Sequence, residues 1–279
     1  MQTDAAPGWV RNVAWYVLLT GLAAAVLFPI WMTIVRALSN PITWSFDRGQ
    51  PPYPVDIEWD VFGRAFDEAS FGRQLAVSAT VTLIIVIGQM VTSVLAAYAF
   101  AFVDFPFKRT MFAVTMATLM LPIEVTLVAN SRTIRELDWT NSFEGLTVPF
   151  LASALGIFLV RQGFLAVPRD LRDAAALDGY GHLRFLWRVA IPITRPVIAA
   201  FVVLSFLAAW NSYLWPRAIT DDSDWNTIQI GLRAVANSTA DQLNVGVAAA
   251  LLAALPVLIV LVLFQRHIVR GLTAGAVKG

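Results

Sequence analysis

Six long apolar stretches constrain this chain more than any other feature of its sequence. Each can cross about 30 Å of hydrocarbon, which takes roughly 20 helical residues. Hydrophobic residues make up 58% of the chain and charged residues only 14%, too little charge to cover the surface of a water-soluble domain. We therefore predict an all-α, polytopic integral membrane protein with six transmembrane helices. The predicted spans are 13–37, 75–102, 108–130, 145–167, 190–215 and 243–265.

The distribution of basic residues favours an N-terminus in the cytoplasm. In that orientation the loops on the inner side are richer in Lys and Arg, and the region 161–195 supplies most of the difference. The outer loops are richer in Asp and Glu. This distribution follows the positive-inside rule.

A polar insert, residues 168–192, separates the fourth and fifth predicted spans on the cytoplasmic side. Pro168 ends the fourth span, and Asp170 is the predicted N-cap of a short helix, with Asp173 three residues further on. Gly179 is predicted to end that helix in a left-handed conformation. A solvated connecting loop is the alternative, but a connection needs only a few residues. The small alanine face between carboxylates suits docking into a cleft on another protein.

The spacing within the insert resembles a known family. "DAAALDG", nine residues and then "VAIP" match the EAA loop of binding-protein-dependent ATP-binding-cassette (ABC) importer permeases, whose pattern is EAA, three residues, Gly, nine residues and I-x-L-P. The resemblance implies a cytoplasmic coupling helix that sits in a groove of the ATPase. Asp173 stands for the family's Glu, so a salt bridge to the ATPase and a simple helix cap both stay open. The implied coupling residues are Asp173, Ala174, Ala175, Asp178, Gly179 and Pro192.

Three further stretches resemble particular branches of that family. "VRGLTAGAVKG" is similar to the C-terminal tail of maltose-type sugar permeases, whose Gly-rich end contacts the ATPase dimer. "TLMLPIEV" and "WNSYLWP" look closer to the sn-glycerol-3-phosphate permease branch. The resemblance implies one ABC importer transmembrane domain over residues 1–279, in the cytoplasmic membrane of a prokaryote. The implied C-terminal contacts with the ATPase are Gly271, Gly275 and Gly279.

The chain cannot form a Walker A loop, which requires Gly before Lys. Its two lysines, Lys108 and Lys278, follow Phe and Val. We therefore expect ATP and Mg on a separate ATPase chain, with no cofactor on this one. The resemblance implies a second homologous permease subunit, two copies of the ATPase and an extracytoplasmic solute-binding protein, besides the lipid bilayer. Cysteine is absent and the two histidines are far apart, so we expect no metal site. Nothing indicates nucleic acid.

Two other classes of membrane protein are alternatives to the importer permease. An ion-coupled secondary transporter needs ionisable groups within its spans, and these spans offer essentially Glu124, with Arg36 near an outer end. A membrane-embedded enzyme needs reactive groups, yet the sequence contains no His–Glu zinc motif and no G-x-S-x-G. The sequence supports both alternatives less well than it supports an importer permease, which catalyses no covalent reaction.

Polar and aromatic residues in the outer half of the spans are candidates for the path of the solute, because polar groups in hydrocarbon are costly. These candidates are Glu124, Asn211, Tyr213 and Trp215. Counted along straight helices, Glu124 and Asn211 are at similar depth. The alternatives are an interfacial aromatic belt for Tyr213 and Trp215 and an interhelical hydrogen bond for Asn211. The expected solute is glycerol 3-phosphate, a glycerophosphodiester or a sugar.

Overall fold

The computed structural model describes residues 8–68, 70–235 and 242–273. Over these residues the regular elements are all helical, with one isolated bridge between Ser39 and Ile57. The predicted all-α class is confirmed. The chain divides into two compact units. The first comprises residues 1–71 and 232–253, and the second comprises residues 72–231 and 254–279.

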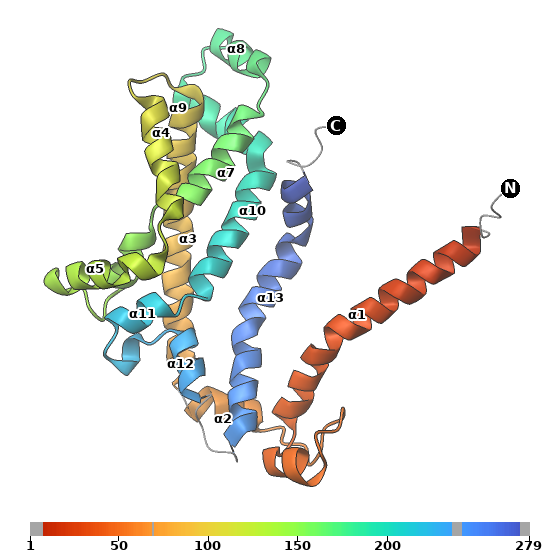
Figure 1. Cartoon of the computed structure of the whole chain (residues 1–279). Helices are drawn as coiled ribbons and strands as arrows, with labels where there is room; N and C mark the ends of the chain where they lie inside the picture. Colours follow the sequence, from red (N-terminus) through yellow and green to blue (C-terminus); the bar gives the residue numbers. More distant parts are fainter. Residues whose placement is uncertain (1–7, 69, 236–241, 274–279) are drawn as a thin grey trace. The chain divides into compact units, whose positions relative to one another are not determined.

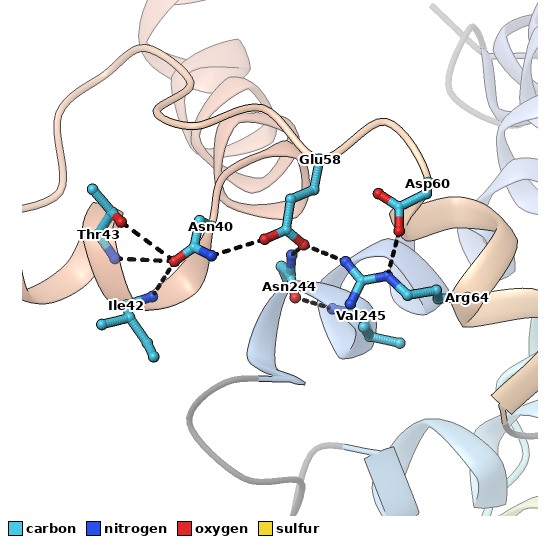
Figure 2. Close-up of polar contacts among 8 residues, drawn as sticks. All are labelled: Asn40, Ile42, Thr43, Glu58, Asp60, Arg64, Asn244 and Val245. Carbon is cyan, nitrogen blue, oxygen red and sulfur yellow. Dashed lines mark hydrogen bonds and ion pairs between the residues drawn. The ribbon is translucent and has the colours of Figure 1, made fainter.

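The first unit is held together at the carboxylate of Glu58, which binds three segments of the chain. The side-chain amides of Asn40 and Asn244 donate to its two oxygens, each at 2.9 Å, and Arg64 forms an ion pair with it (Figure 2). Arg64 also pairs with Asp60 at 2.9 Å. Asn244 is fully buried, so its pairing with a charged acceptor removes the cost of an unsatisfied amide. The helices of this unit are α1 (Gly8–Leu38), η1 (Thr43–Asp47), α2 (Val61–Glu68) and the start of α13 (Leu243–Thr273).

Four helices within the described residues are long and apolar enough to cross a membrane unaided. They agree with the first, second, fifth and sixth predicted spans, although the fifth ends earlier than predicted. The helix α10 (Ile191–Trp210) stops at Trp210, five residues short of the predicted end, and a separate short helix α11 (Leu214–Ile219) follows. The four spans are Arg11–Leu38, Phe71–Phe102, His182–Trp210 and Leu243–Gln265.

The third and fourth predicted spans are not single helices. In the third, α4 (Lys108–Ala117) and α5 (Ile123–Glu136) are bent by 101° at the intervening break. The cause is Pro122: the residue before a proline avoids the helical region, and Leu121 is accordingly extended at φ −87°, ψ 112°. In the fourth, the helices on either side of residues 151–153 are bent by 44°. The described residues therefore contain six candidate spans only if each bent pair counts as one.

The second unit is built around α3 (Phe71–Phe102) and α10, with α8 at one end of α3 and α11 towards the other (Figure 1). Gly156 of α7 lets three helices pack closely, since a Cβ there would overlap the ring of Phe201 in α10 and the hydroxyl of Ser93 in α3. Small residues allow this close approach in membrane helices. The remaining elements are η2 (Thr118–Met120), α6 (Phe143–Thr147), η3 (Val148–Phe150), α7 (Ala154–Leu165), α8 (Arg169–Leu177), α9 (His182–Phe185), η4 (Leu186–Ala190), η5 (Ser223–Trp225) and α12 (Ile228–Val235).

Candidate functional site

The insert forms the predicted short helix, but that helix begins earlier than predicted. α8 starts at Arg169, and Pro168 occupies the N-cap position with an extended backbone. The prediction that Asp170 is the N-cap is therefore wrong. Asp170 lies in the first turn instead, where its negative charge is favourable near the positive end of the helix dipole. Asp173 lies mid-helix and is exposed, so it does not cap the N-terminus of α8.

The end of α8 at Gly179 is as predicted. Gly179 has φ +73°, a conformation that residues with a Cβ rarely adopt. Its N–H donates to the carbonyl of Ala176 at 3.1 Å, and the N–H of Tyr180 donates to the carbonyl of Ala175 at 2.8 Å. These two bonds form a Schellman motif, which satisfies carbonyls at the end of the helix. The direction of the chain after α8 therefore depends on this glycine.

The alanines of α8 have different environments. Ala175 is buried in a hydrophobic cluster of the second unit that contains Tyr98, Phe102, Phe164 and Phe185, whereas Ala174 and Ala176 are exposed. Leu177 is 90% exposed, and Asp173 and Asp178 are exposed as well. Ala175 thus anchors the loop, while the other predicted coupling residues of α8 face outward. Pro192, half-buried, lies in the first turn of α10.

A tyrosine–histidine contact that the sequence analysis did not identify joins the insert to α3. The hydroxyl of Tyr98, on α3, lies 3.0 Å from Nδ1 of His182, the first residue of α9. The ring of Tyr98 also packs against Phe102, Phe164 and Phe185, with centroids 5.2 to 6.4 Å apart. Such aromatic pairs and the hydrogen bond fix the insert to the span. Tyr98 and His182 are 84 residues apart in the chain, so no local sequence pattern predicts their contact.

The predicted C-terminal contacts can be placed only in part. Gly271 lies near the end of α13, which ends at Thr273. Gly275 and Gly279 lie outside the described residues.

A cavity of about 220 Å³ lies within the second unit, at the other end of α3 from the insert. Its polar side chains are Ser78 and Gln89 of α3, Ser205 of α10, and Ser212 and Thr227 from connecting segments. Its remaining walls are apolar or aromatic. They consist of Val81, Ile85, Leu146, Phe150, Ala208, Ala209, Trp210, Trp215 and Pro216.

The structure brings one of the four predicted solute-path residues to this cavity. Trp215 lines it but is only 2% exposed, and its Nε1–H donates to the carbonyl of Gly145 at 3.1 Å. It is therefore a core residue of this unit and not part of an exposed aromatic belt. Asn211 is exposed and donates to the carbonyl of Leu207 within its own helix, at 2.8 Å, so the interhelical bond considered for it is not observed. Among the described residues, the cavity lining does not include Asn211, Tyr213 or Glu124.

The similar depth predicted for Glu124 and Asn211 assumed a straight third span, which the structure does not have. Glu124 lies beyond the break at Pro122, in the first turn of α5, where its side chain is exposed. Counting residues along one straight helix therefore does not give its depth. An acidic residue in the first turn is favourable to the helix dipole, whatever its other role.

Most of the chain, including the insert, matches the model of one protein family. The model for the "binding-protein-dependent transport system inner membrane component" matches residues 69–274, which include all of the insert. The chain belongs to this family. The chain is thus a permease subunit, and the predicted resemblance is confirmed.

Relatives of this permease match over nearly their whole length. It is 35% identical over 255 residues to the sn-glycerol-3-phosphate transport system permease protein UgpE of Yersinia enterocolitica, covering 88% of this chain and 90% of the relative. It is 36% identical over 275 residues to UgpE of Agrobacterium fabrum, covering 94% and 95%. These matches confirm the predicted resemblance to the glycerol-3-phosphate branch.

The permease also shares its fold with solved transporters. A chain in the crystal structure of a bacterial ABC transporter involved in the import of the acidic polysaccharide alginate superposes with a TM-score of 0.82 at 22% identity, over 95% of this permease and 99% of that chain. The permease is therefore a multi-pass membrane protein that moves solute inward as part of an ABC importer. The secondary transporter and the membrane-embedded enzyme are not supported.

Proposed function

We propose that this permease imports glycerol 3-phosphate or a glycerophosphodiester. The observation that supports this most is the match to sn-glycerol-3-phosphate permeases along nearly the full length of the chain. The proposed complex contains a second homologous permease subunit, two copies of a cytoplasmic ABC ATPase, which bind ATP and Mg, and an extracytoplasmic solute-binding protein. This permease itself holds no cofactor and catalyses no reaction.

The outward face of α8 is the proposed contact with the ATPase. Leu177 provides exposed apolar surface, and Asp173 and Asp178 place two carboxylates beside it. A small apolar patch rimmed by charge is typical of a protein–protein contact. Because Ala175 and Tyr98 fix the loop to α3, a displacement of α8 by the ATPase would move α3 as well. The glycine-rich C-terminus, at Gly271, Gly275 and Gly279, is a second proposed ATPase contact.

Glu124, Asn211, Tyr213 and Trp215 remain proposed contributors to the solute path. Glu124 is exposed and negatively charged, so it suits hydroxyl groups or a quaternary ammonium and would repel a free phosphate. Trp215 acts through the shape of the cavity wall, since its indole N–H already donates to Gly145. A choline-bearing glycerophosphodiester would use Glu124 better than glycerol 3-phosphate does.

The proposed orientation places the N-terminus and α8 in the cytoplasm. Reporter fusions after Gly63 and after Asp222 are expected to read as external, and a fusion after Arg184 as cytoplasmic. A cytoplasmic signal at Asp222 would contradict this orientation.

The proposed function is tested with the complete complex in proteoliposomes, with ATP enclosed and the loaded binding protein outside. Labelled sn-glycerol 3-phosphate, glycerophosphocholine and maltose are offered in turn. We expect ATP-dependent uptake of one or both glycerol phosphates and none of maltose. Uptake of maltose alone would overturn the substrate assignment, and uptake without ATP would overturn the proposed energy source.

A further inference from the structure

The cavity at the Trp215 end of the second unit differs from a simple packing defect. A void left by imperfect packing is lined by apolar groups and stays dry. The residues that line this one carry four hydroxyls, of Ser78, Ser205, Ser212 and Thr227, and the carboxamide of Gln89. Its lining contains no Asp, Glu, Lys, Arg or His among the described residues. The lining is therefore mostly apolar, and its polar groups are neutral and able to form hydrogen bonds.

Thr227 has a buried hydroxyl with no partner among the described residues. It is 5% exposed, and its Oγ1 makes no hydrogen bond. A threonine just before a helix, as here before α12, usually caps that helix with its hydroxyl. Here the hydroxyl of Ser78 accepts from the N–H of Ile228 at 2.8 Å, and the Thr227 carbonyl accepts from Ile230 at 3.0 Å. An unpaired buried hydroxyl is unfavourable. Thr227 lines the cavity, but its Oγ1 is closed to solvent in this conformation, so a ligand pairs with it once the side chain rotates towards the cavity.

Gln89 presents a second polar group whose orientation is fixed. Its Nε2 donates to the carbonyl of Phe150 at 2.8 Å, and its Oε1 accepts from the hydroxyl of Ser205 at 2.8 Å. A carboxamide has two N–H donors and two acceptor positions, so one donor and one acceptor position of Gln89 are left by these two bonds. Phe150 and Trp215 add aromatic walls, packed edge to face with ring centroids 5.4 Å apart.

We propose that this cavity binds the neutral, hydroxyl-bearing part of the transported solute, such as a glycerol moiety. This inference rests on the proposed function and names the substrate group that this subunit itself contacts. The hydroxyls of the solute pair with Thr227 and Gln89, and its C–H faces pack against the aromatic walls. A phosphate is excluded, because burying a charge without a nearby cation is costly. The charged group of the solute therefore stays outside the cavity.

The test is Thr227→Val in the complete complex, reconstituted as above and supplied with labelled sn-glycerol 3-phosphate. Valine keeps the shape of threonine and removes the hydroxyl. Since that hydroxyl has no protein partner, its loss is not expected to lower the melting temperature of the complex. We expect the solute imported per ATP hydrolysed to fall about three- to tenfold, as for one lost hydrogen bond. The matched control is Thr194→Val, because Thr194 is buried and its hydroxyl donates to the carbonyl of Ala190, and neither residue lines the cavity; its uptake per ATP should match that of wild type.

Wild-type uptake per ATP in Thr227→Val would overturn the cavity assignment alone. No ATP-driven uptake by the wild-type complex would overturn the proposed function, and the assignment with it.

A second measurement uses the absence of cysteine in this chain. In Ser212→Cys, the labelling of this chain by a small maleimide is followed by mass spectrometry with glycerol or inorganic phosphate added. We expect glycerol to slow labelling at least threefold and phosphate to have no effect. Equal rates with and without glycerol, or protection by phosphate, would contradict a neutral polyol ligand.

Discussion

The two ends of the second unit present polar groups in opposite ways. At the α8 end, the carboxylates and Leu177 are exposed and the anchoring residues, Ala175 and Tyr98, are buried. At the cavity end, neutral polar groups are enclosed with aromatic rings, and the hydroxyl of Thr227 has no partner among the described residues. An exposed patch suits a protein partner, whereas a cavity with apolar walls and a few neutral polar groups suits a small molecule. We infer that the permease contacts the ATPase at the α8 end of α3 and binds the solute at the cavity end.

The strongest test of the α8 end changes its buried anchor. Ala175→Asp places a carboxylate among the rings of Phe102, Phe164 and Phe185. Burying a charged group among these rings is costly even with Arg172 nearby, so the loop should detach from α3 and uptake should fall more than tenfold. The matched control is Ala176→Asp, because Ala176 is exposed. The melting temperature of the purified permease complex should fall for Ala175→Asp only; an equal fall in both would contradict the anchoring role.

A second substitution tests the direction that the loop takes after α8. A Cβ at Gly179 or at Gly181 meets nothing within 4 Å, but only Gly179 has a positive φ. Valine at position 179 therefore introduces backbone strain of about 1–2 kcal/mol without a clash. We expect Gly179→Val to lower uptake about tenfold. Gly181→Val should stay near wild type in the same transport assay, and similar losses in both variants would contradict a role for the Schellman turn.

The bond between Tyr98 and His182 should have a smaller effect. Tyr98→Phe keeps the aromatic packing and removes one hydrogen bond, worth about 0.5–1.5 kcal/mol. We expect uptake to fall about two- to tenfold while ATPase binding is retained. A double-mutant cycle with His182→Ala separates this bond from packing. Strictly additive effects of the two substitutions would show that the pair does not act together.

Glu124→Gln should have the smallest effect, since this side chain is exposed. Exposed charge pairs contribute only about 0–1 kcal/mol. We expect uptake of glycerophosphocholine to fall about two- to fivefold, because the attraction to the quaternary ammonium is lost. Uptake of sn-glycerol 3-phosphate should be unchanged or slightly faster. Equal effects on both solutes would contradict a charge-dependent contact at Glu124.

The α8 end could be predicted from the sequence because its information is contiguous. A fixed spacing from Asp173 to Pro192, with a glycine at the end of a helix, indicates both the turn and the family. The misplaced N-cap arose because Asp170 is a good capping residue by type, while Pro168 already occupied the extended position before the helix. Which alanine is buried could not be predicted, because the answer depends on α3 and α7, distant in sequence.

The cavity could not be predicted because its lining comes from four segments that are distant in the sequence. Gln89 is a single polar residue in an apolar span, and only the structure shows its two bonds to other segments. Thr227 resembles an ordinary helix cap in sequence, and only the structure shows that Ser78 pairs with the first N–H of α12. The sequence analysis also did not predict the bend at Pro122. A proline in a membrane helix can be tolerated, and surrounding structure decides whether the helix breaks.

The most direct test of this division of roles measures ATP hydrolysis and solute uptake together, in proteoliposomes that contain the complete complex. One variant is taken from each end of α3, Gly179→Val and Thr227→Val. We predict that Gly179→Val lowers ATP hydrolysis stimulated by the binding protein and lowers uptake in proportion. We predict that Thr227→Val leaves ATP hydrolysis near the wild-type rate and lowers the solute imported per ATP. The same ratio of uptake to hydrolysis in both variants and wild type would contradict the account.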